Sequence, residues 1–295
     1  MKYEDILARP GKVLSQAQRQ AYFENGYIAL EKFVSADWLA RLNTVTSDFI
    51  EQSRSVTESN GIFDIEPNHS AEAPRLRRLM TPVDRHPEYA EFGLRGPLID
   101  LAEDLLGPNV KYHHSKLNFK WSDGGEEVKW HQDFPFWPHS NAAPLTIGLY
   151  LSDVDAEMGP LGVVPGSHKG RFFTHYDDDG NWTGALRDAD IDEAGIDKAE
   201  FLSGSAGSIT IHNSWMIHGS LPNNSPRPRN LLLHTYSAGD SIVLTNLVEQ
   251  FEHGDELVRG EVPIAMELEQ RRFELPPDWS GGYTSIFALQ QGDDE

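Results

Sequence analysis

Apolar residues spaced three and four positions apart predict helices in the first third of the chain. One helix is expected after Ser15, where Gln18 completes a capping pattern, and it should stop at Gly26 before a short strand at 27–30. Ser35 can cap a second helix, whose apolar residues form one face: Trp38, Leu39, Leu42, Val45, Phe49 and Ile50. A third helix is expected between Gly96-Pro97 and Gly107-Pro108. The polar, irregular residues 52–75 predict a long loop.

From about Val110 the pattern changes to short β-branched or aromatic stretches separated by turn residues. These stretches predict strands at 111–120, 127–132, 144–151, 160–164, 207–212 and 229–236. Short strands separated by turns are typical of an antiparallel sandwich or jelly roll. The acidic residues 175–200 are interpreted as a solvated loop, with a substrate lid as the alternative.

The residues after Ile242 have a mixed composition with two apolar patches, 244–248 and 283–289. We expect them to pack on the β core rather than to form a second domain. The expected organisation is one domain over 1–295, with a mainly helical flank at 1–109, a β core at 110–240 and a C-terminal extension at 241–295.

Composition narrows the possible functions. The 295 residues include no cysteine, and 25 Lys and Arg against 46 Asp and Glu give a net charge of −21. Disulfides, cysteine-ligated metal sites and a cysteine nucleophile are therefore excluded. The acidic excess argues against nucleic acids and anionic membranes as partners. No apolar stretch reaches the ~18 residues of a membrane span, and the N-terminus does not resemble a secretory signal, so we expect a cytoplasmic protein. The sequence does not indicate the oligomeric state.

Twelve histidines and no cysteine make histidine plus carboxylate the main option for a transition-metal site. His131 and Asp133 are two positions apart after a predicted strand, so both could point toward one ion. Three ligands on one side of an ion leave positions open, as in non-haem iron oxygenases. A histidine two residues before Asp or Glu occurs four times, at His86, His131, His175 and His253, against about two expected by chance. Only His131 lies between a predicted strand and an aromatic stretch.

A second group of polar residues follows the predicted strand at 207–212. His218, Gly219 and Ser220 come first, and Arg229 lies eleven residues after His218 at the start of the next strand. A buried arginine needs a carboxylate partner. A dicarboxylate cosubstrate would supply one in a bidentate pair.

Taken together, these motifs resemble the phytanoyl-CoA dioxygenase family, a branch of the Fe(II)/2-oxoglutarate oxygenases. The matching motifs are His131-Gln132-Asp133, Gly159-Pro160-Leu161, Pro165-Gly166-Ser167-His168, and His218-Gly219-Ser220 with Arg229. The resemblance extends from about residue 14 to 240 and leaves the last 50 residues unmatched. It implies a mainly β protein with flanking helices, built on a double-stranded β-helix of the jelly-roll or cupin-like kind. It also implies Fe(II) bound by His131, Asp133 and His218.

The resemblance further implies how 2-oxoglutarate would be bound. Arg229 would pair with its distal carboxylate, and Ser220 would donate a hydrogen bond to it. Residues 116–120 are similar to the segment of small-molecule members such as ectoine hydroxylase and proline 4-hydroxylase in which Asn118 would contact the cosubstrate, and Lys116, two positions away on a strand, would face the same pocket. Thr146 matches another position that can reach 2-oxoglutarate. By similarity, the substrate contacts would be His114, Trp137 and Leu233. Phe136 is a further candidate from the aromatic stretch, for which core packing is an equal alternative.

The implied reaction uses O₂ and 2-oxoglutarate, with ascorbate as a possible reductant, and releases succinate and CO₂. Because halogenating relatives replace the carboxylate ligand, Asp133 favours hydroxylation, or a desaturation or epoxidation variant. The substrate is expected to be an amino acid, a zwitterion or a natural-product intermediate; a CoA ester is disfavoured because no Lys/Arg cluster is seen for its phosphates. Two alternatives are a metal-dependent hydrolase or isomerase, which has no use for Arg229, and a non-catalytic cupin-type binding protein, which does not need all three ligands.

Overall fold

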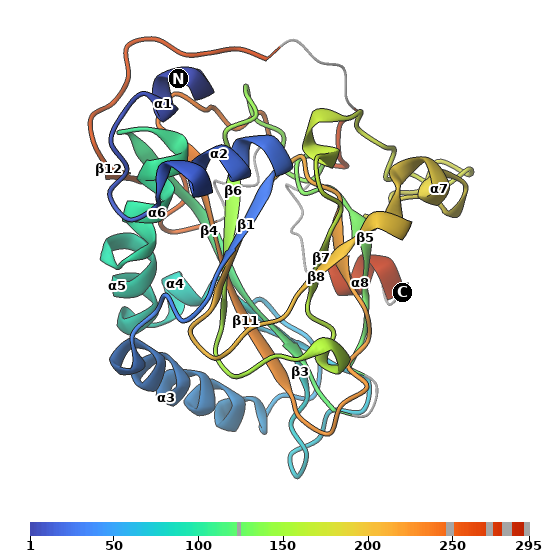
Figure 1. The fold of residues 1–295 in the computed structure, drawn as a ribbon. Coiled ribbons are helices and arrows are strands. Elements are labelled where there is room, and N and C mark those ends of the chain that lie inside the picture. Colours follow the sequence, from blue (N-terminus) through green and yellow to red (C-terminus); the bar gives the residue numbers. More distant parts are fainter. Residues whose placement is uncertain (123–124, 246–250, 270–273, 279–284, 292–295) are drawn as a thin grey trace.

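Two antiparallel sheets form a jelly roll in the computed structural model, which describes residues 1–122, 125–245, 251–269, 274–278 and 285–291 (Figure 1). The larger sheet has the order β1-β9-β6-β11-β4-β3-β2, with β12 also paired to β4, and the smaller has the order β5-β10-β7-β8. The strands are β1 (Tyr27–Leu30), β2 (Phe63–Ile65), β3 (Leu76–Met80), β4 (Val110–Lys120), β5 (Val128–His131), β6 (Leu145–Tyr150), β7 (Leu161–Val163), β8 (Glu200–Leu202), β9 (Ile209–Asn213), β10 (His218–Ser220), β11 (Arg229–Ala238) and β12 (Leu257–Arg259).

Most helices precede the β core in sequence and lie on one side of the larger sheet (Figure 1). The helices are α1 (Tyr3–Leu7), α2 (Gln16–Asn25), α3 (Ala36–Ser53), α4 (Pro82–Arg85), α5 (Pro87–Arg95), α6 (Leu98–Leu106), α7 (Ile191–Ala194) and α8 (Ile286–Gln291). Four 3₁₀ turns are η1 (Ala156–Met158), η2 (Ser167–Lys169), η3 (Asp188–Asp190) and η4 (Ile196–Lys198). The predicted start of α2 is confirmed, because the Ser15 hydroxyl accepts a hydrogen bond from Gln18 N in a reciprocal capping box. Its predicted end is confirmed too, since Gly26 adopts a left-handed φ of 85°.

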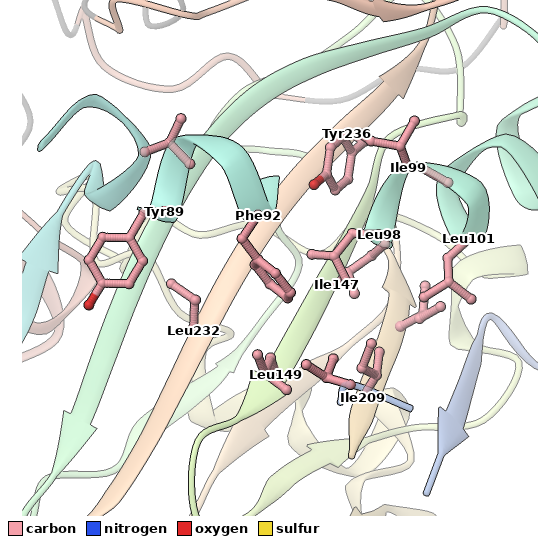
Figure 2. Close-up of a cluster of buried hydrophobic side chains, with 14 of the residues drawn as sticks. Tyr89, Phe92, Leu98, Ile99, Leu101, Ile147, Leu149, Ile209, Leu232 and Tyr236 are labelled. Carbon is pink, nitrogen blue, oxygen red and sulfur yellow. The ribbon is translucent and has the colours of Figure 1, made fainter. Parts of the chain in front are cut away.

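The main hydrophobic core lies between the helices and one face of the larger sheet (Figure 2). Leu98 and Leu101 of α6 belong to the same buried cluster as Ile147 and Leu149 of β6 and Leu232 of β11. Because successive side chains of a strand point to opposite faces, the residues between them are directed toward the smaller sheet. The core covers one face of the larger sheet, so the opposite face is available to line a site.

The long loop predicted at 52–75 is only partly correct. Residues 63–65 form β2, which pairs with β3 at the edge of the larger sheet. A strand of three residues is too short to show a period, so the sequence pattern could not reveal it. The pattern also missed β3, where the adjacent buried residues Arg77 and Arg78 hide the usual alternation of apolar and polar positions.

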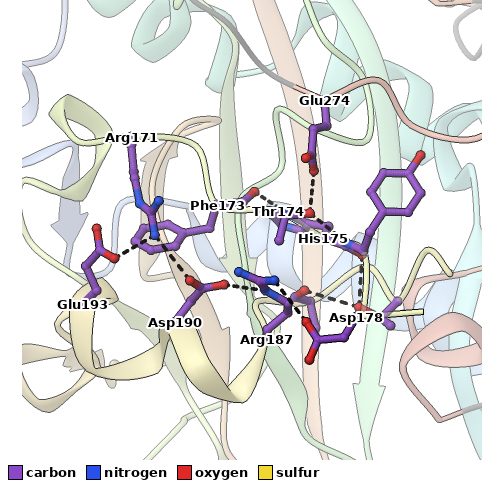
Figure 3. A network of polar contacts seen from close by, with 12 residues as sticks. Arg171, Phe173, Thr174, His175, Asp178, Arg187, Asp190, Glu193 and Glu274 are labelled. Carbon is purple, nitrogen blue, oxygen red and sulfur yellow. Dashed lines mark hydrogen bonds and ion pairs between the residues drawn. The ribbon is translucent and has the colours of Figure 1, made fainter. Parts of the chain in front are cut away.

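The acidic residues 175–200 fold into short helical turns held by two arginines (Figure 3). Asp190 lies 3.3 Å from Arg171 Nη2 and 2.8 Å from Arg187 Nε. Arg171 also pairs with Glu193 at 2.7 Å, and the side chain of Glu193 is 62% exposed. Such exposed pairs add little stability, about 0–1 kcal/mol each. Most acidic residues of this segment are exposed, whereas Asp190 and the apolar residues Leu186 and Ala194 are buried.

The C-terminal residues contact the β core at two places. β12 pairs with β4, and the side chain of Gln290 in α8 accepts a hydrogen bond from Lys129 N of β5 at 2.8 Å. Of the two apolar patches predicted in this region, 246–248 and 283–284 lie outside the described residues. Among the helices of the described residues, none has both the length and the apolar character that crossing a membrane requires.

Candidate metal and cosubstrate site

Strand pairing brings the three predicted metal ligands together. His131 ends β5, Asp133 follows two residues later, and His218 begins β10, which pairs with β5 so that His218 lies opposite His131. All three side chains are buried, and one ligand atom from each lies within 4.8 Å of the others. Asp133 Oδ1 is 3.8 Å from Nε2 of His131 and 3.8 Å from Nε2 of His218. This is the only such cluster of potential metal ligands among the described residues.

Backbone carbonyl groups orient both imidazole rings. Nδ1 of His131 lies 2.8 Å from Lys129 O, and Nδ1 of His218 lies 2.9 Å from Met216 O. Because a carbonyl can only accept, each Nδ1 carries the proton and each Nε2 keeps a free electron pair toward Asp133. Burial lowers the pKa of His131 well below its usual value and that of His218 to about 3. Both rings are therefore neutral near pH 7, the form that binds a metal ion.

Asp133 is held as a carboxylate by its neighbours. Burial on its own would raise the pKa of this group, but the positive charge of Lys116, together with His218 and His212, keeps it well below its usual range. Thr146 Oγ1 donates a hydrogen bond to Oδ2 at 3.3 Å, and His212 Nε2 lies 3.5 Å from the same oxygen. These contacts occupy Oδ2 and leave Oδ1 facing the two histidines. The donor set of two neutral imidazoles and one carboxylate fits Fe(II) with open positions.

Arg229 lies in the same cavity and has no carboxylate partner among the described residues. Its side chain is 2% exposed, and Nη2 donates a hydrogen bond to Gly159 O at 3.0 Å. Nε and Nη1 are buried without a hydrogen-bond partner in the described part of the chain. Burial lowers the pKa of Arg229 to about 10, so the group stays charged near pH 7. A buried guanidinium with free N–H groups fits the distal carboxylate of 2-oxoglutarate.

The cavity around these groups has a volume of about 40 Å³ in this conformation. Its lining is Arg78, Lys116, Asn118, Val128, His131, Asp133, Thr146, Leu161, His212, His218, Gly219, Ser220, Arg229, Leu231, Leu233 and Ile286. All five predicted cosubstrate residues are in this lining, and so is Leu233. None of residues 175–200 lines it, which favours the solvated-loop interpretation over the lid.

The other predicted substrate contacts, His114, Trp137 and Phe136, are not part of this lining and stay predictions. Trp137 packs against His114, with ring centroids 5.7 Å apart, and His114 Nδ1 is 2.6 Å from His113 Nδ1. Phe136 meets His131 edge-on at 5.9 Å between ring centroids. In this arrangement, Phe136 supports a predicted ligand.

Two polar side chains of the lining were not predicted, those of Arg78 and His212. Arg78 lies in β3 opposite Asn118 of β4, and its Nε donates to Asn118 Oδ1 at 2.9 Å. His212 lies in β9. The alternation in β9 could have placed it correctly, because Ile209 and Ile211 face the core and His212, the next residue, therefore points to the opposite face of the sheet.

The remaining His-x-acid motifs have other roles. His86 caps α5 by accepting a hydrogen bond from Glu88 N. His253 pairs with Glu256 at 2.7 Å on the surface. His175 is buried and supports the site indirectly. Its Nε2 accepts a hydrogen bond at 3.0 Å from the backbone N–H of Gln132, the residue between the ligands His131 and Asp133.

Comparisons with known proteins agree with this site. The profile of the phytanoyl-CoA dioxygenase (PhyH) family matches residues 22–231. The chain is 30% identical over 277 residues to a probable alpha-ketoglutarate-dependent hypophosphite dioxygenase of Stutzerimonas stutzeri, covering 93% of this chain and 96% of the relative. It is 27% identical over 243 residues to an ectoine dioxygenase of Sphingopyxis alaskensis, covering 76% of each chain. A crystal structure of EctD from S. alaskensis with 2-oxoglutarate and 5-hydroxyectoine has a TM-score of 0.66 and 25% identity, and the match covers 90% of this chain and 91% of that one. The chain therefore belongs to the phytanoyl-CoA dioxygenase family.

Proposed function

We propose that this protein is an Fe(II)- and 2-oxoglutarate-dependent dioxygenase that hydroxylates a small molecule. The observation that carries the proposal is the presence, in one cavity, of a complete His-Asp-His cluster and a buried arginine without a carboxylate partner. A hydrolase or isomerase would use the metal ligands but leaves the charge of Arg229 unexplained. A passive binding protein would not need three neutral or anionic ligands oriented toward one point.

His131, Asp133 and His218 would hold Fe(II) through Nε2, Oδ1 and Nε2. With iron and 2-oxoglutarate bound, the site supplies the oxidising chemistry that inserts oxygen from O₂ into a substrate bond and releases succinate and CO₂. The Nδ1 hydrogen bonds of the two histidines fix the direction of their electron pairs. Thr146 supports the Asp133 carboxylate by donating a hydrogen bond to Oδ2 at 3.3 Å, and it stays a predicted contact of the cosubstrate because it also lines the cavity.

Arg229 would bind the distal carboxylate of 2-oxoglutarate with its free Nε and Nη1 groups. Ser220 lies on β10 of the smaller sheet, where Lys120 Nζ donates a hydrogen bond to the Ser220 carbonyl at 3.1 Å and fixes its backbone. The amide oxygen of Asn118 accepts a hydrogen bond from Arg78, so the NH₂ group of Asn118 is left to donate into the cavity. Lys116 is a further candidate contact. Together these groups would orient the cosubstrate between the metal and β11.

The apolar part of the lining would exclude water around the reacting bond. It consists of Val128 of β5, Leu161 of β7, Leu231 and Leu233 of β11, and Ile286 of α8. The names of the two relatives above refer to the small molecules hypophosphite and ectoine, which supports a small substrate.

The proposal is tested by incubating the protein with Fe(II), ascorbate, 2-oxoglutarate and O₂ and measuring succinate and bound iron. We expect one iron per chain and slow succinate release without added substrate, and Asp133→Ala should lose both. Asp255→Ala is the matched control, because Asp255 belongs to the surface His-x-Asp motif at His253. Iron binding without any affinity for 2-oxoglutarate would contradict the proposal and favour a hydrolase or isomerase.

A further inference from the structure

The cavity carries a positive charge that the cosubstrate does not balance. Among the described residues, its lining contains three cationic side chains, Arg78, Lys116 and Arg229, and one carboxylate, Asp133. The histidine ligands are neutral, so the lining has a net charge of +2 when Lys116 is protonated. Fe²⁺ raises this to +4, and the two carboxylates of 2-oxoglutarate return it to +2. An excess therefore remains whichever of the cations contacts the cosubstrate.

Arg78 is the cation with the least compensation. Its side chain is 2% exposed, and no carboxylate among the described residues lies within 4 Å of it. Nε is bonded to Asn118, while Nη2 is buried without a hydrogen-bond partner in the described part of the chain. The ring of Phe287 lies over the guanidinium at 5.5 Å, which limits its freedom to turn away. A buried, oriented and unpaired guanidinium is built to receive an anion.

The strand register separates Arg78 from Arg229, the residue proposed to bind the distal carboxylate of 2-oxoglutarate. Arg229 is on β11 and Arg78 is on β3, with β4 between them, so the two backbones lie about 10 Å apart. Lys116 is on β4, two residues from Asn118, the residue opposite Arg78. Lys116 and Arg78 are therefore diagonal neighbours on the cavity face. The two form a second cationic arm on the β3 side of the metal ligands.

We propose that Arg78, with Lys116 beside it, binds an anionic group of the substrate, either a carboxylate or a phosphorus oxyanion. The inference rests on the proposed function, because it concerns the substrate of that same site. The ion would sit against the fork of Arg78 and the ammonium of Lys116, next to the open side of the metal.

The same lining argues against a zwitterion. Asp133 is the only carboxylate in the described lining, and its oxygens face the metal ligands, Thr146 and His212. An ammonium group of the substrate would therefore find no counter-charge. The sequence led us to expect an amino acid, a zwitterion or a natural-product intermediate, but the acidic excess behind the net charge of −21 lies outside this cavity. The substrate class narrows to small molecules with a net negative charge.

The test uses the full chain loaded with Fe(II) and 2-oxoglutarate. In the absence of O₂, hypophosphite, phosphite, methylphosphonate and acetate are each added, and the melting temperature is measured, with L-proline and ectoine as zwitterionic probes. In the presence of O₂, succinate release is measured with the same compounds. We expect at least one anion to raise the melting temperature and to increase succinate release more than either zwitterion.

Arg78→Met and Arg78→Lys then test the residue itself. Loss of charge-assisted hydrogen bonds should weaken binding of that anion by roughly 10- to 100-fold in Arg78→Met, and Arg78→Lys should restore part of it. Arg85→Met is the control, since Arg85 is exposed and bonded to Gly61 O, and it should match the unmodified protein. Circular dichroism and the apo melting temperature report whether each variant folds.

Three outcomes would overturn the inference. One is that none of the four anions raises the melting temperature of the loaded protein. Another is that a zwitterion, but no anion, stimulates succinate release. The last is that Arg78→Met weakens 2-oxoglutarate rather than the anion, which would make Arg78 a cosubstrate residue. Failure of the proposed function has a different signature, because the unmodified protein would then bind no iron or no 2-oxoglutarate at all.

Discussion

Replacing Arg229 by methionine should weaken the binding of 2-oxoglutarate without destabilising the folded protein, which distinguishes a binding role of this buried charge from a structural one. Nε and Nη1 are free in the described structure, and each can form a charge-assisted hydrogen bond worth about 1.5–3 kcal/mol. Losing both should cost at least about 3 kcal/mol, which raises the Kd of 2-oxoglutarate by roughly 100-fold or more.

The same substitution should not destabilise the metal-free protein. An unpaired buried charge costs several kcal/mol, and methionine removes that cost while losing the bond to Gly159 O, worth about 1 kcal/mol. We expect the free energy of unfolding to stay the same or to rise by about 1–3 kcal/mol.

Anaerobic calorimetry with Fe(II) measures the Kd of 2-oxoglutarate, and urea unfolding of the apo protein measures the free energy of unfolding. Arg227→Met is the matched control, because Arg227 is 52% exposed, pairs with Asp155 at the surface and should leave both unchanged. An unaltered Kd in Arg229→Met would refute the cosubstrate assignment. A stability loss of more than about 2 kcal/mol would show that Arg229 is structural.

Three further predictions concern the metal site and its surroundings. His218→Ala should abolish iron binding, measured by metal analysis, whereas His253→Ala at the surface should bind iron normally. Thr146→Val, which removes the hydroxyl that donates to Asp133, should lower iron affinity about 10- to 100-fold in a chelator competition; unchanged affinity would exclude this support. His234 is buried and burial lowers its pKa to about 3, so below about pH 6.5 the unfolded chain takes up a proton that the folded chain does not. Through this group, the free energy of unfolding of the apo protein should decrease by up to about 1.4 kcal/mol for each pH unit of acidification. A free energy of unfolding that does not change with pH would contradict this prediction.

Much of the fold followed from local patterns. The caps at Ser15 and Ser35 and the alternation of the long strands depend on residues close in sequence, and the structure confirms these elements. β2 and β3 did not follow, because the burial of Arg77 depends on Asp64, thirteen positions away, and on Glu126, which belongs to a distant segment. The pattern of apolar and polar residues within a segment gives no information about a partner so far away in the sequence.

In the candidate site, too, the sequence predicted some residues and strand pairing decided the rest. The sequence pointed to His131, Asp133, His218 and Arg229 as residue types with the right chemistry, and to four His-x-acid motifs. The pairing of β5 with β10 decided which motif has a third ligand beside it. Arg78 entered the cavity only through the pairing of β3 with β4.

The sequence by itself determined the local elements, the absence of thiol chemistry and the set of residues able to bind a metal. Only the tertiary structure decided the charge of the cavity. A net charge of −21 is a sum over the whole chain, whereas the energy of a buried anion depends on the few charges close to it and on how little water lies between them. Strand pairing gathers three cations around one carboxylate, and so an acidic protein contains a cationic site.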